Sequence, residues 1–189
     1  YEDITIPAPP KDDIGEAAEV KRLITNRTAE QDKSIADHDE VPFYAIKKYC
    51  DDNKMVFHKD EFKDIIYQAT DTINYFKDKF DRKRPIEIDK TLDTSPSKTN
   101  KTPSYPSGHA AQSRIVAKYV AGKFPEHEAE LIEAGNECGY GRVLAGFHYV
   151  SDYEVGNLLG EKMYVLMNKM DYGQEMNEDK ISFKDFLKN

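Results

Sequence analysis

The chain has 189 residues, of which 39% are hydrophobic and 33% charged, and its formal net charge is −8. Its mean hydropathy is −0.76, and no apolar run approaches the roughly 20 residues of a membrane-spanning helix, so we expect a soluble protein without membrane insertion. The acidic balance argues against nucleic acid as a partner, because proteins that bind nucleic acid usually present a basic face. The length suits a single domain over residues 1–189.

The first half of the chain predicts an arm followed by three helices. Residues 1–13 are rich in proline and lack helical periodicity, which indicates an extended arm. Residues 13–31 and 42–51 predict two helices, and 59–80 predict the clearest one, because apolar residues recur there at three- and four-residue steps. The inward-facing residues of this third helix are Phe62, Ile65, Ile66, Ala69, Ile73, Phe76 and Phe80.

The second half predicts three more helices. One begins at Ser107 and ends near Phe124, before Pro125, and the others cover 126–147 and about 151–170. The apolar residues expected to face inward on the last helix are Val155, Leu158, Leu159, Met163, Leu166 and Met170. Since no alternating run of strand type stands out, we expect an all-α fold, a compact helical bundle.

The long segment 84–106 lacks helical periodicity and is rich in Pro, Ser and Thr. Loops of this length in compact domains are usually functional or disordered, and we favour a loop that frames a site. The two cysteines, Cys50 and Cys138, allow one disulfide at most, and their spacing does not decide whether it forms.

Three segments combine cations with histidines. The first, "KDKFDRKRP", places Lys77 and Arg84 seven residues apart, so they share a face if the helix continues, and Pro85 should end it. Cations at the end of a helix are more often simply solvated, because they favour its negative pole. The other basic residues of this segment are Lys79, Arg82 and Lys83.

The second segment, "PSGHAA", opens the helix that begins at Ser107. The first N–H groups of a helix are unpaired and attract anions, and Gly108 has no side chain to block an approaching oxyanion. The hydroxyl of Ser107 is suited to capping the helix. His109 would stand beside any bound anion, although a lone histidine is more often only a half-buried structural residue.

The third segment, "GRVLAGFHYVSD", contains Arg142, His148 and Asp152. A carboxylate four residues after a histidine reaches a ring N–H if both lie in one helical turn. That contact fixes the tautomer and leaves the other ring nitrogen free as a nucleophile. Together, the three segments offer three cations, hydrogen-bond donors and two histidines, which suits the charge distribution of a phosphoryl group in transfer.

The three motifs Lys77-x6-Arg84-Pro85, Pro106-Ser107-Gly108-His109 and Arg142-x5-His148-x3-Asp152 resemble the signature of the type 2 phosphatidic acid phosphatase (PAP2) superfamily, which also contains the vanadium haloperoxidases. With "SYPSGH" and the start "IPAPP", the chain looks most like the bacterial class A non-specific acid phosphatases.

The resemblance implies metal-independent hydrolysis of small phosphate monoesters, with a broad substrate range and an acidic optimum. His148, oriented by Asp152, would form a phosphohistidine, and His109 would protonate the leaving group and then activate water. The residues expected to bind phosphate are Lys77, Arg84, Ser107, Gly108 and Arg142. No cofactor is implied, although vanadate could occupy the phosphate site.

The resemblance also implies a periplasmic or secreted location, with a cytoplasmic one left open, and relatives of this class are often homo-oligomers. One position departs from the family, since Gly141 stands where a serine usually precedes the arginine of the third motif. We therefore question the local support of Arg142, but not the core chemistry.

Other functions stay open. A vanadium-dependent haloperoxidase would use the same oxyanion site, and a narrower pyrophosphatase or nucleotide phosphatase would use the same chemistry. A non-catalytic module that binds phosphate or a phospholipid headgroup would not need His148 and Asp152. The sequence "ADHDE" around His38 resembles a metal cluster, but we interpret it as a solvated turn before Pro42.

Overall fold

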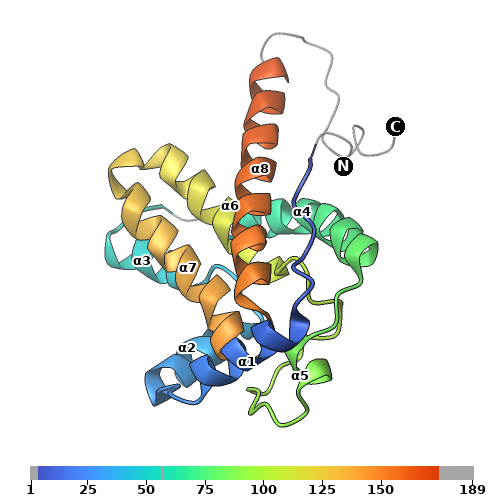
Figure 1. Cartoon of the computed structure of the whole chain (residues 1–189). Helices are drawn as coiled ribbons and strands as arrows, with labels where there is room; N and C mark the ends of the chain where they lie inside the picture. Colours follow the sequence, from blue (N-terminus) through green and yellow to red (C-terminus); the bar gives the residue numbers. More distant parts are fainter. Residues whose placement is uncertain (1–3, 57, 175–189) are drawn as a thin grey trace.

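The computed structural model of the chain describes residues 4–56 and 58–174, and all regular secondary structure in these ranges is helical (Figure 1). The elements are α1 (Asp13–Ile24), α2 (Ala29–Asp39), α3 (Tyr44–Asp52), α4 (Lys59–Phe80), α5 (Pro85–Ile88), α6 (Gly108–Lys123), the 3₁₀ turn η1 (Pro125–His127), α7 (Glu128–Leu144) and α8 (Val150–Gln174). The prediction of an all-α fold is confirmed.

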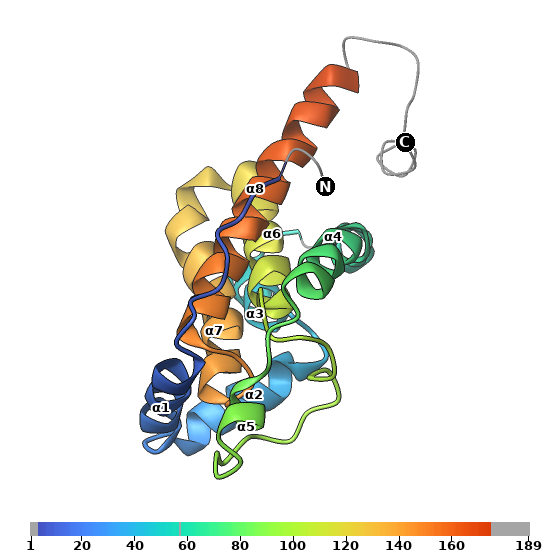
Figure 2. The same ribbon diagram turned by 45° about the vertical axis from the view of Figure 1, so that its right-hand side comes forward.

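Helix α6 is the centre of the bundle. It packs against α4, α7 and α8, and in Figure 2 it lies between α8 and α4. Its buried side chains are mostly small or β-branched: Ala110, Ala111, Ser113, Ile115, Val116, Ala117, Val120 and Ala121. A helix with apolar residues on several faces is suited to such an enclosed position.

Helices α6 and α8 approach each other at backbone distance. A Cβ atom at Gly156 would lie 2.6 Å from the carbonyl oxygen of Ser107, and one at Gly160 would lie 2.6 Å from that of Ala111. The two glycines of α8 therefore make this close crossing possible.

The N-terminal arm runs along α8 in both views (Figures 1 and 2). Lys162 Nζ donates a hydrogen bond to the carbonyl of Thr5 at 2.7 Å, and Tyr105 Oη donates one to that of Pro7 at 2.6 Å. The arm ends at Asp12, whose carboxylate accepts the N–H of Gly15 and caps α1.

The prediction of one helix over residues 13–31 is wrong, because α1 ends at Ile24 and a separate helix, α2, begins at Ala29. Thr28 caps α2: its hydroxyl accepts the N–H of Gln31, whose side chain accepts the N–H of Thr28. This capping box was a readable signal in the sequence.

Helices α3, α4, α6, α7 and α8 lie where we expected them, within a few residues at each end, whereas the short α5 lies in the segment that we predicted as a loop. One detail is wrong: Pro85 does not end α4, which stops at Phe80, where Asp81 follows in the left-handed conformation. Pro85 instead begins the short α5, a position that suits its fixed φ. On α8, Leu159 and Met163 are buried as predicted, whereas the side chain of Met170 lies outside the described residues.

Candidate active site

A cavity of about 310 Å³ lies where the end of α2 and helices α4, α6 and α7 meet the segment 84–106. Six of the eight predicted site residues line it: Lys77, Arg84, Gly108, His109, Arg142 and His148. Ser107 and Asp152 are fully buried: the Ser107 N–H donates to the backbone carbonyl of Asp152, and the Asp152 carboxylate contacts His148. The three motifs, far apart in sequence, therefore meet at one cavity.

His148 lies just before α8, and Asp152 lies in the first turn of this helix. His148 Nδ1 is 3.2 Å from Asp152 Oδ2, which also accepts the backbone N–H of Tyr149 at 3.0 Å. An acidic residue at this position of a helix reaches back to a free N–H, which explains why it also faces the histidine. If Nδ1 carries the proton and donates it to the carboxylate, Nε2 keeps its lone pair.

The free nitrogen of this histidine faces cations. His148 Nε2 is 3.4 Å from Arg84 Nη1. Burial lowers the pKa of His148 well below its usual value, and the charges of Arg84 and Lys77 lower it further. His148 is therefore a neutral ring in the free protein, as an attacking nucleophile must be.

Lys77 and Arg84 are fixed by backbone carbonyls of the loop 84–106. Lys77 Nζ donates to the carbonyl of Pro103, and Arg84 Nε donates to that of Thr102 at 2.8 Å. Burial, reinforced by repulsion from neighbouring arginines, lowers the pKa of Lys77 to about 7 and that of Arg84 to about 10. A bound anion would relieve this repulsion.

The reason we gave for pairing Lys77 with Arg84 is wrong, although both residues line the cavity. They do not share a helical face, because Arg84 lies beyond the end of α4. The turn after Phe80 brings Arg84 back to the cavity. Lys79 and Lys83 are solvated, in line with the simpler expectation for a helix end.

Arg142 is 1% exposed, and Asp39 neutralises it. Arg142 Nη1 donates to Asp39 Oδ1 at 2.8 Å, and Nη2 donates to Thr99 Oγ1 at 2.9 Å. Burial opposes the charge on Asp39, but hydrogen bonds from Ser97, the Lys98 N–H and Arg142 outweigh it and lower the pKa of this carboxyl group. The buried Nε of Arg142 has no hydrogen-bond partner among the described residues.

His109 lies in the first turn of α6, and its Nε2 is 3.0 Å from the backbone carbonyl of Asp39. Burial, followed by the charge of Arg142, lowers the pKa of His109 to about 3. The free protein therefore holds His109 neutral, with Nε2–H donating to the carbonyl. An anion in the cavity would favour its protonation.

Ser107 caps α6, since its hydroxyl accepts the N–H of Ala110 at 3.4 Å. Its backbone N–H donates to the carbonyl of Asp152 at 3.0 Å, which ties the start of α6 to α8. The next residue, Gly108, lines the cavity. That Ser107 also binds phosphate stays a prediction.

Asp39 was not among the predicted site residues, because the segment "ADHDE" looked like a solvated turn. That interpretation is wrong: the segment is the end of α2, and His38 is 2% exposed. His38 Nε2 accepts the N–H of Ala45 at 3.2 Å, so Nδ1 donates to the carbonyl of Ser34 at 2.8 Å. His38 thus connects α2 to α3, and this places Asp39 at the cavity.

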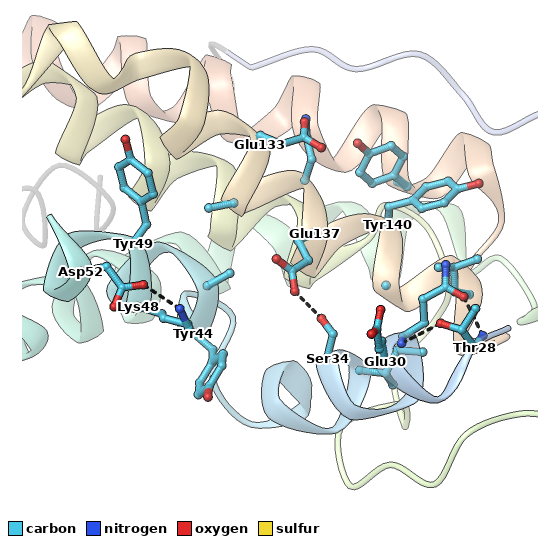
Figure 3. A pocket seen from close by; sticks show the side chains of 18 residues that line it. Thr28, Glu30, Ser34, Tyr44, Lys48, Tyr49, Asp52, Glu133, Glu137 and Tyr140 are labelled. Atoms are coloured by element: carbon cyan, nitrogen blue, oxygen red, sulfur yellow. Dashed lines mark hydrogen bonds and ion pairs between the residues drawn. The ribbon is translucent and has the colours of Figure 1, made fainter.

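A larger groove of about 960 Å³ lies between α2, α3 and α7 (Figure 3). Its labelled side chains include Glu30, Asp52, Glu133 and Glu137, and its lysine, Lys48, is paired with Asp52. This acidic groove is unsuited to an anion, so the smaller cationic cavity is the better phosphate site.

Gly141 faces this groove, where a Cβ atom would meet only Ile35 Cγ1, at 3.8 Å. The support of Arg142 that we questioned comes instead from Asp39 and Thr99. Neither cysteine forms a disulfide, since Cys50 and Cys138 are both free and buried.

Residues 65–174 match the family model of the PAP2 superfamily, and the chain belongs to that superfamily. The acid phosphatase of Zymomonas mobilis is 30% identical over 110 residues, which are 56% of this chain and 42% of that protein. The non-specific acid phosphatase of Salmonella typhi is 42% identical over 57 residues, 30% of this chain and 23% of that protein. Each match thus covers less than half of the relative.

The fold is similar to that of a transmembrane PAP2 type phosphatidylglycerolphosphate phosphatase from Bacillus subtilis. The TM-score is 0.58 over 85% of this chain and 86% of that chain, at 17% identity. Within residues 4–56 and 58–174, no helix is long and apolar enough to cross a membrane.

The expected periplasmic or secreted location is contradicted. It came from the resemblance to the class A phosphatases, but a transmembrane enzyme has the same fold. Membership of the superfamily therefore does not define a compartment.

Proposed function

We propose that this protein hydrolyses phosphate monoesters through a phosphohistidine at His148. The observation that carries the proposal is the placement of His148 Nε2, 3.4 Å from Arg84 in a cavity that Lys77 and Arg142 also line, while Asp152 contacts Nδ1. The named relatives are acid phosphatases, which supports the same reaction.

In the first step, the lone pair of His148 Nε2 attacks phosphorus and the bond from phosphorus to the ester oxygen breaks. His109 gives a proton to the departing alkoxide. In the second step, His109 takes a proton from water, which attacks phosphorus and breaks the N–P bond. Inorganic phosphate and neutral His148 result.

The cations stabilise the charge on the three non-reacting oxygens. Lys77, Arg84 and Arg142 surround the cavity, and the Gly108 N–H adds a donor at the start of α6. We propose that these groups supply the positive charge that magnesium ions supply in other phosphoryl transfers, so that no metal is needed. Vanadate should occupy the same cavity.

The proposed optimum is acidic. His148 is already neutral in the free protein, so the scarce species is protonated His109, whose pKa is about 3 before substrate binds. Lower pH favours this proton, and the charge of the substrate holds it. We also propose a broad range of small-molecule phosphate esters as substrates.

The test is release of phosphate from p-nitrophenyl phosphate at mildly acidic pH with EDTA, compared among wild type, His148→Ala and the control His58→Ala. His58 is exposed and lies outside the cavity. We expect turnover in wild type and the control, and none in His148→Ala. Rapid quenching should trap an acid-labile phosphoryl group on His148.

Full activity of His148→Ala would exclude this nucleophile. A wild type that binds phosphate without turnover would favour a binding module. Halide oxidation with vanadate and peroxide would favour the haloperoxidase. Turnover of only pyrophosphate or nucleotides would contradict the broad substrate range.

A further inference from the structure

Arg82 is buried beside the active site but does not line its cavity. The side chain is 3% exposed, and its residue lies in the turn between α4 and α5. In the sequence, Arg82 is one of the basic residues of "KDKFDRKRP", and no role was predicted for it. Its contacts lead away from the phosphate site and toward Asp152.

Arg82 holds the oxygen of Asp152 that His148 does not contact. Asp152 Oδ2 interacts with His148 Nδ1, the hydroxyl of Ser104 and the N–H of Tyr149. Asp152 Oδ1 accepts from Arg82 Nη1 at 2.8 Å, and the carboxylate is 0% exposed. With both oxygens held, the carboxylate has no freedom to turn away from His148.

Arg82 is itself held on every side. Its Nε and Nη2 donate to Asp13 Oδ1 at 3.0 and 2.8 Å, and Nη2 also donates to Glu16. Its Nη1 donates to Ser151 Oγ at 2.8 Å, and its guanidinium carbon lies 3.9 Å from the centre of the Tyr149 ring. A guanidinium with these contacts is a rigid link between α1 and α8.

The charge of Arg82 matters as much as its geometry. Burial raises the pKa of Asp152, and Arg82 is the strongest group acting against this rise. The other charged or titratable groups that act on Asp152 or on Arg82 are Lys77, Arg84, His148, Tyr105, Tyr149, Asp13 and Glu16. The ionised form of Asp152 therefore depends on this arginine.

We propose that Arg82 is a positioning residue for the hydrolysis: acting through Asp152, it fixes the Nδ1–H tautomer of His148 and keeps Nε2 free to attack. Asp13 and Glu16 of α1 hold Arg82 in place. The role in turnover rests on the proposed function. Through Asp13 and Glu16, α1 would then also help to orient the nucleophile, although this helix lies outside the family match of residues 65–174.

The first measurement is independent of activity. Nitrogen–proton spectra of the histidine rings at neutral pH, with His148 assigned by its loss in His148→Ala, should show one Nδ1–H tautomer in wild type. Arg82→Leu should give a mixture of the two His148 tautomers. Arg82→Lys keeps the positive charge but loses the paired N–H donors of the guanidinium, so its spectrum should lie between those of wild type and Arg82→Leu. An unchanged His148 signal in both variants would overturn the proposal.

The second measurement is the kinetics on p-nitrophenyl phosphate. In Arg82→Leu, His148 should lose its fixed orientation, and kcat should fall by about 100-fold. KM should change little, because Arg82 does not touch the substrate. Without Arg82, protonation of Asp152 should begin at higher pH, so the acidic limb of the profile should move to higher pH. A KM effect without loss of kcat, or an unmoved acidic limb, would contradict the proposal.

The matched control is Arg114→Lys. Arg114 is another mostly buried arginine, paired with Glu161 and Asn136 away from the cavity. It should lose stability but keep the tautomer, the kcat and the acidic limb. If wild type shows the tautomer and its dependence on Arg82 but no turnover, the proposed function fails while the orientation of His148 by Arg82 stands.

Discussion

Asp39 and Arg142 form an ion pair at the cavity, with 2.8 Å between Oδ1 and Nη1. The backbone carbonyl of the same aspartate accepts a hydrogen bond from His109 Nε2 at 3.0 Å. One residue at the end of α2 therefore contacts both a candidate phosphate ligand and the candidate proton donor. It also fixes the loop 84–106, through Ser97 and the Lys98 N–H.

Asp39→Asn should destabilise the free protein by about 3 kcal/mol, because it leaves the buried charge of Arg142 without its counter-charge. Added phosphate should restore more stability to this variant than to wild type, since the anion replaces the missing carboxylate. Urea denaturation with and without phosphate measures both effects. Asp37→Asn, which removes an exposed pair with Lys33, is the control and should change stability little, because water screens such a pair. Equal stability of Asp39→Asn and wild type would contradict the prediction.

Gly141→Ala should stabilise the protein by up to about 1 kcal/mol, because alanine favours the helix and the added methyl group contacts only Ile35. Gly141→Ser should leave kcat/KM within about twofold of wild type, since Arg142 already has partners. Denaturation and steady-state kinetics test the pair of variants. A large gain of activity in Gly141→Ser would show that Arg142 lacks support in this chain.

His109→Gln should lose about 10² to 10⁴ in rate on an alkyl phosphate, because the leaving alkoxide must be protonated. The loss on p-nitrophenyl phosphate should be much smaller, since p-nitrophenolate leaves without a proton. The ratio of the two rates in wild type and variant is the measurement. An equal loss on both substrates would exclude His109 as the acid.

Sulfate should bind more weakly as pH rises through neutrality. Its own charge is constant there, so the dependence reports on the protein. The pKa of Lys77 is lowered to about 7, so above this pH the free lysine is neutral and must regain a proton to bind the anion. Affinity should fall by up to about tenfold per pH unit, as measured by calorimetry. Lys77→Met should bind sulfate less tightly and with a weaker dependence on pH. A wild-type affinity that does not change with pH would contradict the prediction.

Stability should decrease on acidification. In the folded protein, the pKa values of His109 and His148 lie below the ordinary 6.5, and burial is the largest cause. Below pH 6.5, the unfolded chain therefore binds protons at these two rings that the folded chain does not bind. The free energy of unfolding should therefore fall by up to about 1.4 kcal/mol per pH unit for each ring between that pH and the folded pKa. Denaturation at several pH values should show a shallower slope for His109→Gln, whereas an equal slope would contradict the prediction.

The sequence was sufficient for most of the helices, although not for the break between α1 and α2, and for the cavity residues that carry motif spacing. Apolar periodicity placed α4 at its observed bounds, and proline and the cap at Ser107 placed α6. The spacing of His148 and Asp152 predicted their contact, which the structure confirms at 3.2 Å. These features depend on local geometry, and local geometry can be read from a sequence.

Long-range partners could not be read in this way. Asp39 lies 103 residues from Arg142, and Arg82 lies 69 residues from Asp13. Charged residues look solvated in a sequence unless their burial is known, and here tertiary packing determines burial. The prediction for His38 was wrong for the same reason. Its ring is buried, and both ring nitrogens form hydrogen bonds with backbone groups of α2 and α3.

The close crossing of α6 and α8 has a consequence for how reliably the reacting groups are spaced. The start of α6 carries His109, and the start of α8 carries Asp152, which contacts the nucleophile His148. A Cβ atom at Gly156 would lie 2.6 Å from the backbone carbonyl oxygen of Ser107, so this glycine lets the two backbones approach closely. A flexible side chain at such a crossing would act as an adjustable spacer, whereas backbone contact is a fixed stop. One methyl group at residue 156, which does not line the cavity, would therefore reset the gap between nucleophile and proton donor.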